Sequence, residues 1–523
     1  MWVFPEISQL GDIPRFHARA RPDAPAIIAE GQRLTWRELD LESNRVANAL
    51  GSAGLRREDC VGYLGKNTPF LPIGLFGVSK AGMTFMPLNW RLAAAEIAEI
   101  LRDSECRLMF VESEFLDLAE DALRRAGVRP RIVELGRSGA TESAITNFLR
   151  DASTQDSLVS VPSTVTALRV YTSGTTGLPK GVELSHENFN MSRLCEHLEP
   201  AIPWTCDDVF LMFMPNFHTA GSGLMLQSLY NGGAVSMLHA FEPGLVLRAI
   251  EETRPTILLI VPSALQMMLE HPRARATDFS SLKLCMYAGS PSSLPLIQRA
   301  MAEMRCDFVQ WYGATETLSA VTLLRGHQHR LDDEAKLKSC GTPVPLTGLR
   351  VVGPSGVDVR VGEVGEIWVR TPTLFKGYWK RPDETARVKQ NGWYRTGDAG
   401  FQDSDGYLYI HDRIKDMIVS GGENVYSAEV ERVLERHPAV AQVAVIGVPD
   451  AKWGEAIKAM IVLHEGAAVG EAELIAFCRG SLGGYKLPKS VEFVSEFPRT
   501  PSGKVQKATL RAPYWKGRTR AVG

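Results

Sequence analysis

Several features that mark particular classes of protein are scarce or missing in this chain. The 8 cysteines stand singly, and no two are spaced as Cys-x-x-Cys, which argues against a zinc ribbon or a dithiol redox pair. We expect most of them to be small buried hydrophobic residues. Lysine and arginine total 58 against 60 aspartates and glutamates, so the net charge of -2 lacks the basic surplus of nucleic-acid-binding proteins.

Long apolar runs are missing as well. Apolar runs such as ILLIV at 257–261 fall far short of the ~20 residues that cross a bilayer. The opening stretch MWVFPEISQLGDIPRF lacks the basic segment and apolar run of a secretory signal. We therefore expect no transmembrane segment and a reducing, cytoplasmic location. The sequence leaves a homodimer open, and contact of the basic carboxyl-terminal end with an anionic membrane is the minor alternative to a solvated tail.

Short, almost continuously apolar runs that end in small or polar residues are what the chain does contain. Continuous rather than alternating hydrophobicity predicts strands buried on both faces, as in parallel sheets covered by helices. In such sheets ligands bind at the carboxyl ends of the strands. The runs are CRLMFVES (106–113), DVFLMFMP (208–215), TILLIVPS (256–263), KLCMYAGS (283–290) and DFVQWYGATE (307–316).

Helical spacing and glycine turns divide the α/β chain further. Helices are predicted within 34–55 and 425–438, the second with Ser427 as its N-cap. Glycine turns between short β-rich runs near 354–370 predict a small β subdomain at about 330–411. We expect a large N-terminal domain over 1–411 and a smaller α/β C-terminal domain over 412–523, with strands in AVAQVAVIGV, AIKAMIVLH and SVEFVSEF.

The stretch SGTTGLPKGV at 173–182 has the ingredients of an anion-binding loop. It is not a Walker loop, because Pro179 rather than glycine precedes Lys180 and glycine follows it. Its glycines let backbone N–H groups approach phosphate oxygens, its hydroxyls donate hydrogen bonds, and Lys180 supplies charge. Taken alone, such a stretch is more typical of an ordinary surface loop rich in Gly, Ser and Thr.

Five motifs together resemble the AMP-forming acyl-CoA synthetase family, which includes luciferases and the adenylation domains of peptide synthetases. They are YTSGTTGLPKGVELSH (171–186), WYGATE (311–316), GWYRTGDAG (392–400), DRIKDMIVSGGENVYSAEVE (412–431) and PRTPSGKVQK (498–507), in the order of the family. The resemblance implies a reaction in two halves. A carboxylate attacks the α-phosphate of ATP and expels pyrophosphate, and a thiol then attacks the acyl carbon and releases AMP.

The resemblance also implies roles for residues of the large domain. The loop would wrap the β- and γ-phosphates of ATP, Tyr312 would stack on adenine, Thr315 would bond the α-phosphate, and Glu316 would hold Mg²⁺. A strand end followed by a helix-starting Thr and Glu is the structural alternative for the latter pair. The loop residues implied are Thr172, Ser173, Gly174, Thr175, Thr176 and Lys180, and the adenine-site residues are Gly289, Ser290, Trp311, Tyr312 and Gly313.

Further roles fall on the carboxyl-terminal part of the chain. Asp398 and Arg413 would bind the ribose, and Lys504 would be catalytic, bridging the substrate carboxylate and the α-phosphate. Lys415 would be the hinge about which this domain rotates between the half-reactions, after which Gly421 and Gly422 would let the pantetheine arm of coenzyme A pass. Solvated tail residues are expected at Lys507, Arg511, Lys516, Arg518 and Arg520.

The acid itself is less sharply indicated. His218 occupies a position where the family often has histidine or an aromatic residue, although a structural histidine at a strand end is the alternative. NFHTAG at 216–221 lacks the aspartate of amino-acid-activating relatives, and Leu318 and Ala320 are apolar, so an uncharged tail is expected. We favour a fatty acid, followed by aryl or cyclic acids. The tryptophan that some long-chain enzymes carry just after this histidine is missing.

The leading prediction is thus an acyl-CoA synthetase whose small-molecule partners are ATP, Mg²⁺, coenzyme A and a carboxylic acid. An enzyme that loads a carrier protein is a second reading, and a luciferase-like oxygenase is a third. A non-catalytic nucleotide-binding protein is disfavoured, because Glu316, Asp398 and Lys504 are all present.

Overall fold

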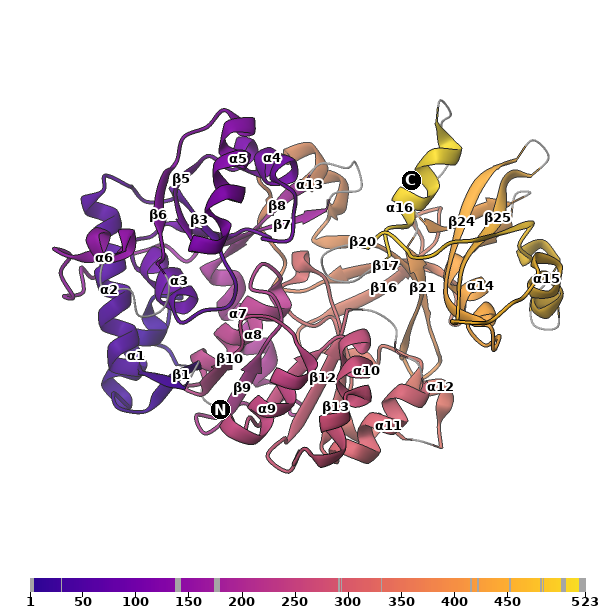
Figure 1. Ribbon diagram of the computed structural model, residues 1–523, viewed down its shortest axis with the longest axis horizontal. Helices are drawn as coiled ribbons and strands as arrows, with labels where there is room; N and C mark the ends of the chain where they lie inside the picture. The colour runs from indigo at the N-terminus through magenta and orange to yellow at the C-terminus, as the bar shows by residue number, and fades with distance from the viewer. Residues whose placement is uncertain are drawn as a thin grey trace. The chain divides into compact units, whose positions relative to one another are not determined.

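The computed structural model describes residues 4–29, 31–136, 143–173, 179–289, 292, 294–330, 332–413, 416–420, 423–450, 453–479, 482, 484–499 and 505–516. Contacts within the chain group it into two units, which we describe separately (Figure 1). Unit 1 comprises Met1–Gly348 and Arg370–Tyr394, and unit 2 comprises Leu349–Val369 and Arg395–Gly523. The predicted mixed α/β class, with parallel sheets and a small β subdomain, is confirmed.

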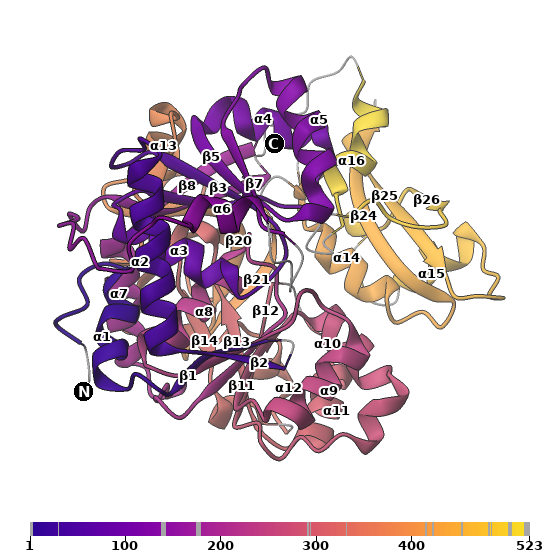
Figure 2. The same ribbon diagram turned by 60° about the vertical axis from the view of Figure 1, so that its left-hand side comes forward.

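The first sheet of unit 1 is covered by helices on both faces. Helices α2 (Trp36–Ser52) and α3 (Phe70–Lys80) share one core with alternate strand residues such as Val61 and Tyr63, and α4 (Ala94–Ser104) and α5 (Leu116–Ala126) share another with Cys60 and Leu64 (Figure 2). This explains the continuous hydrophobicity of these strands. The strand order is β6 (Arg131–Glu134), β5 (Cys106–Val111), β3 (Cys60–Leu64), β4 (Thr84–Pro87), β7 (Thr166–Ser173), β8 (Pro179–Ser185) and β18 (Gly377–Tyr378).

The second sheet of unit 1 contains four of the five predicted apolar strands. Its central strands are parallel and lie side by side in the order β1, β10, β9, β11, β12 and β13. Ala288 of β12 lies opposite Trp311 of β13. The carboxyl ends of these two neighbouring strands therefore meet at one edge. The order is β15 (Thr342–Pro343), β14 (Thr322–Leu324), β13 (Asp307–Tyr312), β12 (Leu284–Ala288), β11 (Ile257–Ile260), β9 (Val209–Met212), β10 (Ala234–Met237), β1 (Pro25–Ala29) and β2 (Gln32–Thr35).

Helix α2 shows why the predicted helices form. Thr35 caps it: the Thr35 hydroxyl accepts from the Glu38 N–H at 3.2 Å, and the Glu38 carboxylate accepts from the Thr35 N–H at 2.8 Å. The other helices of unit 1 are α1 (Asp12–Ala20), α6 (Ala144–Leu149), α7 (His186–His197), α8 (Thr219–Tyr230), α9 (Pro243–Thr253), α10 (Pro262–Glu270), α11 (Leu294–Met304), α12 (Glu334–Leu337) and α13 (Pro382–Val388).

Two small sheets lie wholly or mainly in unit 2. The first has the order β16 (Gly348–Val352), β17 (Gly365–Arg370), β20 (Trp393–Gln402) and β19 (Lys389–Gln390), with β21 (Leu408–Arg413) also beside β20, and its strand β19 belongs to unit 1. The second has the three strands predicted near the carboxyl end and packs on α14 (Ser427–Leu434) and α15 (Glu471–Arg479). Its order is β23 (Glu423–Val425), β22 (Ile418–Ser420), β25 (Gly454–Leu463) and β24 (Val440–Asp450), with β26 (Ser490–Phe493) also beside β25.

Two expectations about unit 2 are wrong in detail. Ser427 is the first residue of α14 and not its N-cap, and its hydroxyl accepts from the ammonium of Lys507. Lys507 also pairs with Glu431 at 2.8 Å, and Arg511 pairs with Asp416 at 3.0 Å, with only 15% and 12% of these basic side chains exposed. These two residues are therefore not solvated tail cations, because they attach α16 (Lys507–Arg511) to the rest of unit 2.

The expectation that most of the cysteines are buried is confirmed. All the cysteines are free; Cys206 is exposed, Cys306 and Cys340 are half-buried, and the others are buried. Within the described ranges we find no helix with the length and apolar character needed to span a bilayer.

Candidate active site

The shared edge of β12 and β13 brings together most of the predicted adenine-site residues. Gly289 directly follows β12 and has a φ of +89°, a left-handed conformation that favours glycine. Tyr312 is the last residue of β13, next to Trp311, and Gly313 follows it. Ser290 lies outside the described residues.

A tight turn then carries the chain to Thr315 and Glu316. A Cβ atom on Gly313 would lie 2.7 Å from the carbonyl oxygen of Ser319, so no other residue fits there without a shift of the backbone. The hydroxyl of Thr317 donates to the Ser319 carbonyl at 3.0 Å and holds the turn closed. The short 3-10 helix η3 (Thr315–Thr317) is thereby fixed just beyond the end of β13.

The strands on both sides of the predicted phosphate loop pair with each other. Thr172 of β7 lies opposite Lys180 of β8, and Ser173 lies opposite Pro179. The ammonium of Lys180 forms an ion pair with Glu384 of α13, and it lies 5.4 Å from the centroid of the Tyr378 ring. Gly174, Thr175 and Thr176 fall outside the described residues.

Glu316 has the surroundings of a carboxylate that can accept a metal ion. It is half-buried, and its Oε1 accepts a hydrogen bond of 2.7 Å from the Tyr378 hydroxyl. Of the residues that the structure describes, none forms an ion pair with this carboxylate. Burial, and then the charge of Glu316, raise the pKa of Tyr378 well above its usual value, so the phenol stays protonated and donates.

The chemistry of this site fits Mg²⁺ bound together with phosphate. No group of three or more His, Cys, Asp or Glu side chains in the described parts of the chain could enclose a metal ion. Mg²⁺ does not need such a cage, because it commonly binds one or two carboxylates and completes its shell with substrate phosphates and water. Glu316 is the carboxylate that these surroundings offer.

His218 lies at the start of helix α8, as its N-cap residue. Its ring centroid is 4.8 Å from that of Phe217, and the side chain is half-buried. The small and apolar residues of the first turns, Gly221 to Met225, are buried, and a Cβ atom on Gly221 would lie 2.3 Å from the carbonyl oxygen of Pro215. Close packing of α8 on the preceding segment therefore accounts for at least one of these glycines.

The two predicted ribose-binding residues are neighbours in unit 2. Asp398 of β20 and Arg413 of β21 are opposite each other in an antiparallel pair, and Asp398 is 8% exposed. The Asp398 N–H donates to the Thr396 hydroxyl at 3.0 Å, and this hydroxyl donates to the Ile367 carbonyl at 2.8 Å. Lys415, Gly421, Gly422 and Lys504 lie outside the described residues, as does the side chain of Arg413.

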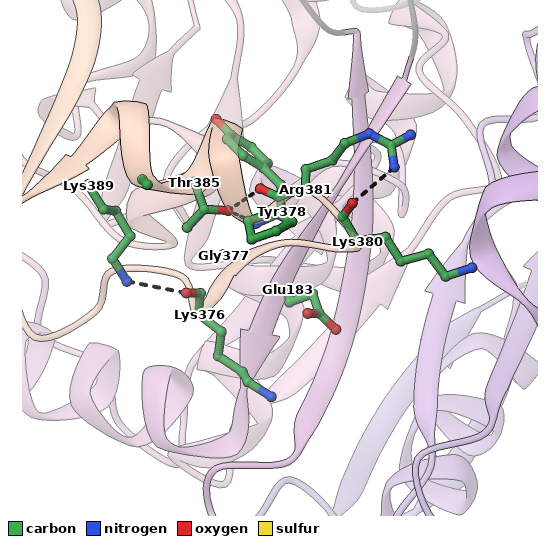
Figure 3. Close-up of a pocket in the computed structure, with 10 residues that line it drawn as sticks. Glu183, Lys376, Gly377, Tyr378, Lys380, Arg381, Thr385 and Lys389 are labelled. Atoms are coloured by element: carbon green, nitrogen blue, oxygen red, sulfur yellow. Dashed lines mark hydrogen bonds between the residues drawn. The ribbon is translucent and has the colours of Figure 1, made fainter.

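A surface pocket of about 550 Å³ lies along β8, β18 and α13, and none of the predicted site residues that the structure describes lines it (Figure 3). Figure 3 shows Tyr378 and Thr385 beside each other in this pocket, where the Tyr378 N–H donates to the Thr385 hydroxyl at 2.9 Å. Neither Tyr378 nor Glu384 is among the site residues predicted from the sequence. The string GYWKRPDETA at 377–386 carries no spacing that would indicate contact with Glu316 or Lys180.

Comparison with known proteins identifies the family of the chain. The model of the AMP-binding enzyme family matches residues 15–379, and that of the AMP-binding enzyme C-terminal domain matches 429–504. The fatty acid–[acyl-carrier-protein] ligase ScoC of Streptomyces coeruleorubidus is 39% identical over 520 residues, 99% of each chain. Feruloyl-CoA synthase of an Amycolatopsis species is 40% identical over 506 residues, 97% of this chain and 99% of the synthase.

A solved structure extends the likeness to three dimensions. The anthranilate CoA ligase AuaEII in complex with anthranoyl-AMP superposes with a TM-score of 0.86 at 29% identity, over 98% of both chains. The family models cover most of the chain, and the two relatives cover nearly all of it. The chain therefore belongs to the AMP-binding enzyme family of AMP-forming acyl-CoA synthetases, and it is an acid–thiol ligase that acts by adenylation.

Proposed function

We propose that this enzyme activates an apolar carboxylic acid with ATP and transfers the acyl group to coenzyme A. A fatty acid is the first candidate for the acid. A carboxylate oxygen of the acid attacks the α-phosphorus of ATP, and the bond to pyrophosphate breaks. The thiol of coenzyme A then attacks the acyl carbon of the adenylate, the bond to the AMP oxygen breaks, and the thiol proton is lost.

One observation carries the assignment of the phosphate site. Lys180, at the exit of the loop, and Glu316, beyond β13, both lie against Tyr378. Lys180 Nζ is 5.4 Å from the Tyr378 ring centroid, and Glu316 Oε1 is 2.7 Å from the Tyr378 hydroxyl. A cation and a metal-binding carboxylate this close together suit one triphosphate. The first half-reaction brings two anions together, and such aligned positive charge lowers its barrier.

The roles of the residues are those that their motifs, by resemblance to the family, imply. Lys180 and the hydroxyls of Thr172 and Ser173 hold the β- and γ-phosphates, and Thr315 donates to the α-phosphate. Bound at Glu316, Mg²⁺ would neutralise phosphate charge. The attacking carboxylate binds at Lys504 and His218, the ribose at Asp398 and Arg413, and the pantetheine arm at Gly421 and Gly422, with the hinge at Lys415. The residues assigned to the adenine are Gly289, Ser290, Trp311, Tyr312 and Gly313.

The names of similar proteins support a second candidate for the acid substrate and a second candidate for the thiol acceptor. The relatives act on fatty acid, ferulate or anthranilate by their names, so an aryl acid is the second candidate for the substrate. ScoC is named as a ligase for an acyl carrier protein, which makes a carrier thiol the second candidate for the acceptor.

A screen of pyrophosphate release tests the proposal. The wild-type enzyme is incubated with ATP, Mg²⁺ and alkyl, aryl or steroid-like acids, with and without coenzyme A or a phosphopantetheinylated carrier protein. We expect alkyl acids of some chain length to give the highest rate, and a thioester to form with coenzyme A. Release with aryl acids only, or a thioester with the carrier only, would select the second candidates. Release that no acid stimulates would contradict adenylation of these classes.

A further inference from the structure

Residues 371–385 form a segment, here called the strap, that lies along the strand leaving the phosphate loop. The chain passes through unit 2 at 349–369 and returns to unit 1 with this segment. Its two-residue strand β18 extends the first sheet, with Gly377 opposite Glu183 and Tyr378 opposite Val182. On either side of β18, the Lys376 N–H donates to the Glu183 carbonyl at 2.9 Å, and the Trp379 N–H donates to the Gly181 carbonyl at 2.8 Å.

The same strap is bonded to the segment that carries Glu316. The Phe375 N–H donates to the Glu316 carbonyl at 2.9 Å, and the Thr373 hydroxyl donates to the Thr317 carbonyl at 2.7 Å. The backbone of η3 is thus tied to the strand that begins at the phosphate loop. Because each contact joins segments far apart in the sequence, the relative position of Lys180 and Glu316 depends on the strap.

Tyr378 is the strap residue that reaches both functional side chains. Its ring is 9% exposed and packs edge-on against Phe375, with 4.9 Å between the ring centroids. Its N–H is held by Thr385 at 2.9 Å. The ring is therefore held by its packing on Phe375 and its backbone by Thr385, and the hydroxyl donates to Glu316 Oε1 at 2.7 Å.

We propose that Tyr378 is a positioning residue for Glu316: its hydroxyl binds one carboxylate oxygen and fixes the side chain, whose other oxygen would hold the Mg²⁺ of a bound triphosphate. The inference rests on the proposed role of Glu316. Hydrogen bonds to a ligating carboxylate fix its orientation, and their loss commonly weakens metal binding 10- to 100-fold. Tyr378 touches neither metal nor substrate in this scheme and acts through Glu316.

The test is calorimetric binding of ATP without acid, so that no turnover occurs. Tyr378→Phe keeps the ring and removes the hydroxyl. We expect it to weaken binding of the Mg²⁺–ATP complex at least about tenfold and to leave binding of metal-free ATP, measured in EDTA, unchanged. Tyr63→Phe is the matched control, because it also removes a buried phenol, one that donates to the Lys66 carbonyl at 2.7 Å. It should change neither affinity.

Glu316→Gln separates the inference from the function beneath it. This variant should lose the preference for Mg²⁺–ATP, and adding Tyr378→Phe to it should cause no further loss. Unchanged Mg²⁺–ATP binding in Tyr378→Phe, beside a loss in Glu316→Gln, would overturn the positioning role alone. Equal weakening of metal-bound and metal-free ATP in Tyr378→Phe would show a merely structural role. An unaffected Glu316→Gln would remove the proposed metal site and the inference together.

Discussion

Three buried histidines of unit 1 are held in their neutral form. Burial lowers the pKa of His17, His186 and His329 to about 4 in each case. His186 is fully buried, and its Nδ1 accepts a hydrogen bond from the Leu10 N–H at 3.1 Å, which a protonated ring could not do. The neighbouring Asp12 favours the charged form but does not offset burial.

The low pKa of His186 predicts that acid destabilises the protein. The unfolded chain takes up the proton near pH 6.5 but the folded chain only near pH 4, so the stability is present above pH 6.5 and is lost as the pH falls towards 4. Between pH 7.5 and 5.0, protonation linked to this one histidine lowers the free energy of unfolding by about 2 kcal/mol. The His186→Asn variant should therefore lose about 2 kcal/mol less free energy of unfolding over this range than the wild type does, as measured by urea titrations followed by circular dichroism.

The exposed His327 offers the control for that experiment. His327→Asn should lose as much stability between the two pH values as the wild-type protein does. If His186→Asn were as sensitive to acid as the wild type, the buried neutral state of His186 would not be a source of the effect.

Among the elements, strand β8 and helix α13 are joined by the ion pair of Lys180 and Glu384, whose side chains are only 14% and 26% exposed. A triphosphate that binds Lys180 must compete with this carboxylate. Ion pairs near a surface contribute up to about 1 kcal/mol, so Glu384→Gln should tighten ATP binding by no more than about fivefold. Calorimetric titration with ATP gives the affinity directly.

A neighbour in the same helical turn provides the matched variant. Asp383 is exposed, and Asp383→Asn removes the same charge without breaking the pair with Lys180. It should leave the affinity for ATP nearly unchanged. Equal affinities for wild type and Glu384→Gln, or weaker binding by Glu384→Gln, would argue against competition for Lys180.

The sequence predicts the elements well where burial alone decides them. Runs such as ILLI at 257–260 must be covered on both faces, and the five predicted strands of unit 1 are all present. The strap is different. Its strand has only two residues, and Tyr378 lies 62 positions from its partner Glu316. Neither propensity nor periodicity encodes such a pairing, because it exists only once the sheets have assembled. The partners of Lys507 and Arg511 escaped prediction for the same reason.

For the whole molecule, we predict that Lys504, in the carboxyl-terminal part of the chain, serves the first half-reaction only. Asp398 and Arg413 belong to unit 2, and Thr172, Lys180 and Glu316 belong to unit 1. A hinge at Lys415 and catalysis by Lys504 remain predictions from the resemblance of their motifs to those of the family.

Lys504→Ala offers the most direct measurement, because the half-reactions can be assayed apart. Acid-dependent exchange of labelled pyrophosphate into ATP reports the first, and conversion of a presynthesised acyl-adenylate to its coenzyme A thioester reports the second. We predict that Lys504→Ala loses exchange by at least about a hundredfold, as expected for removal of a charge aligned with the transition state, and keeps thioester formation near the wild-type rate. Equal loss of both half-reactions, or exchange at the wild-type rate, would contradict the account.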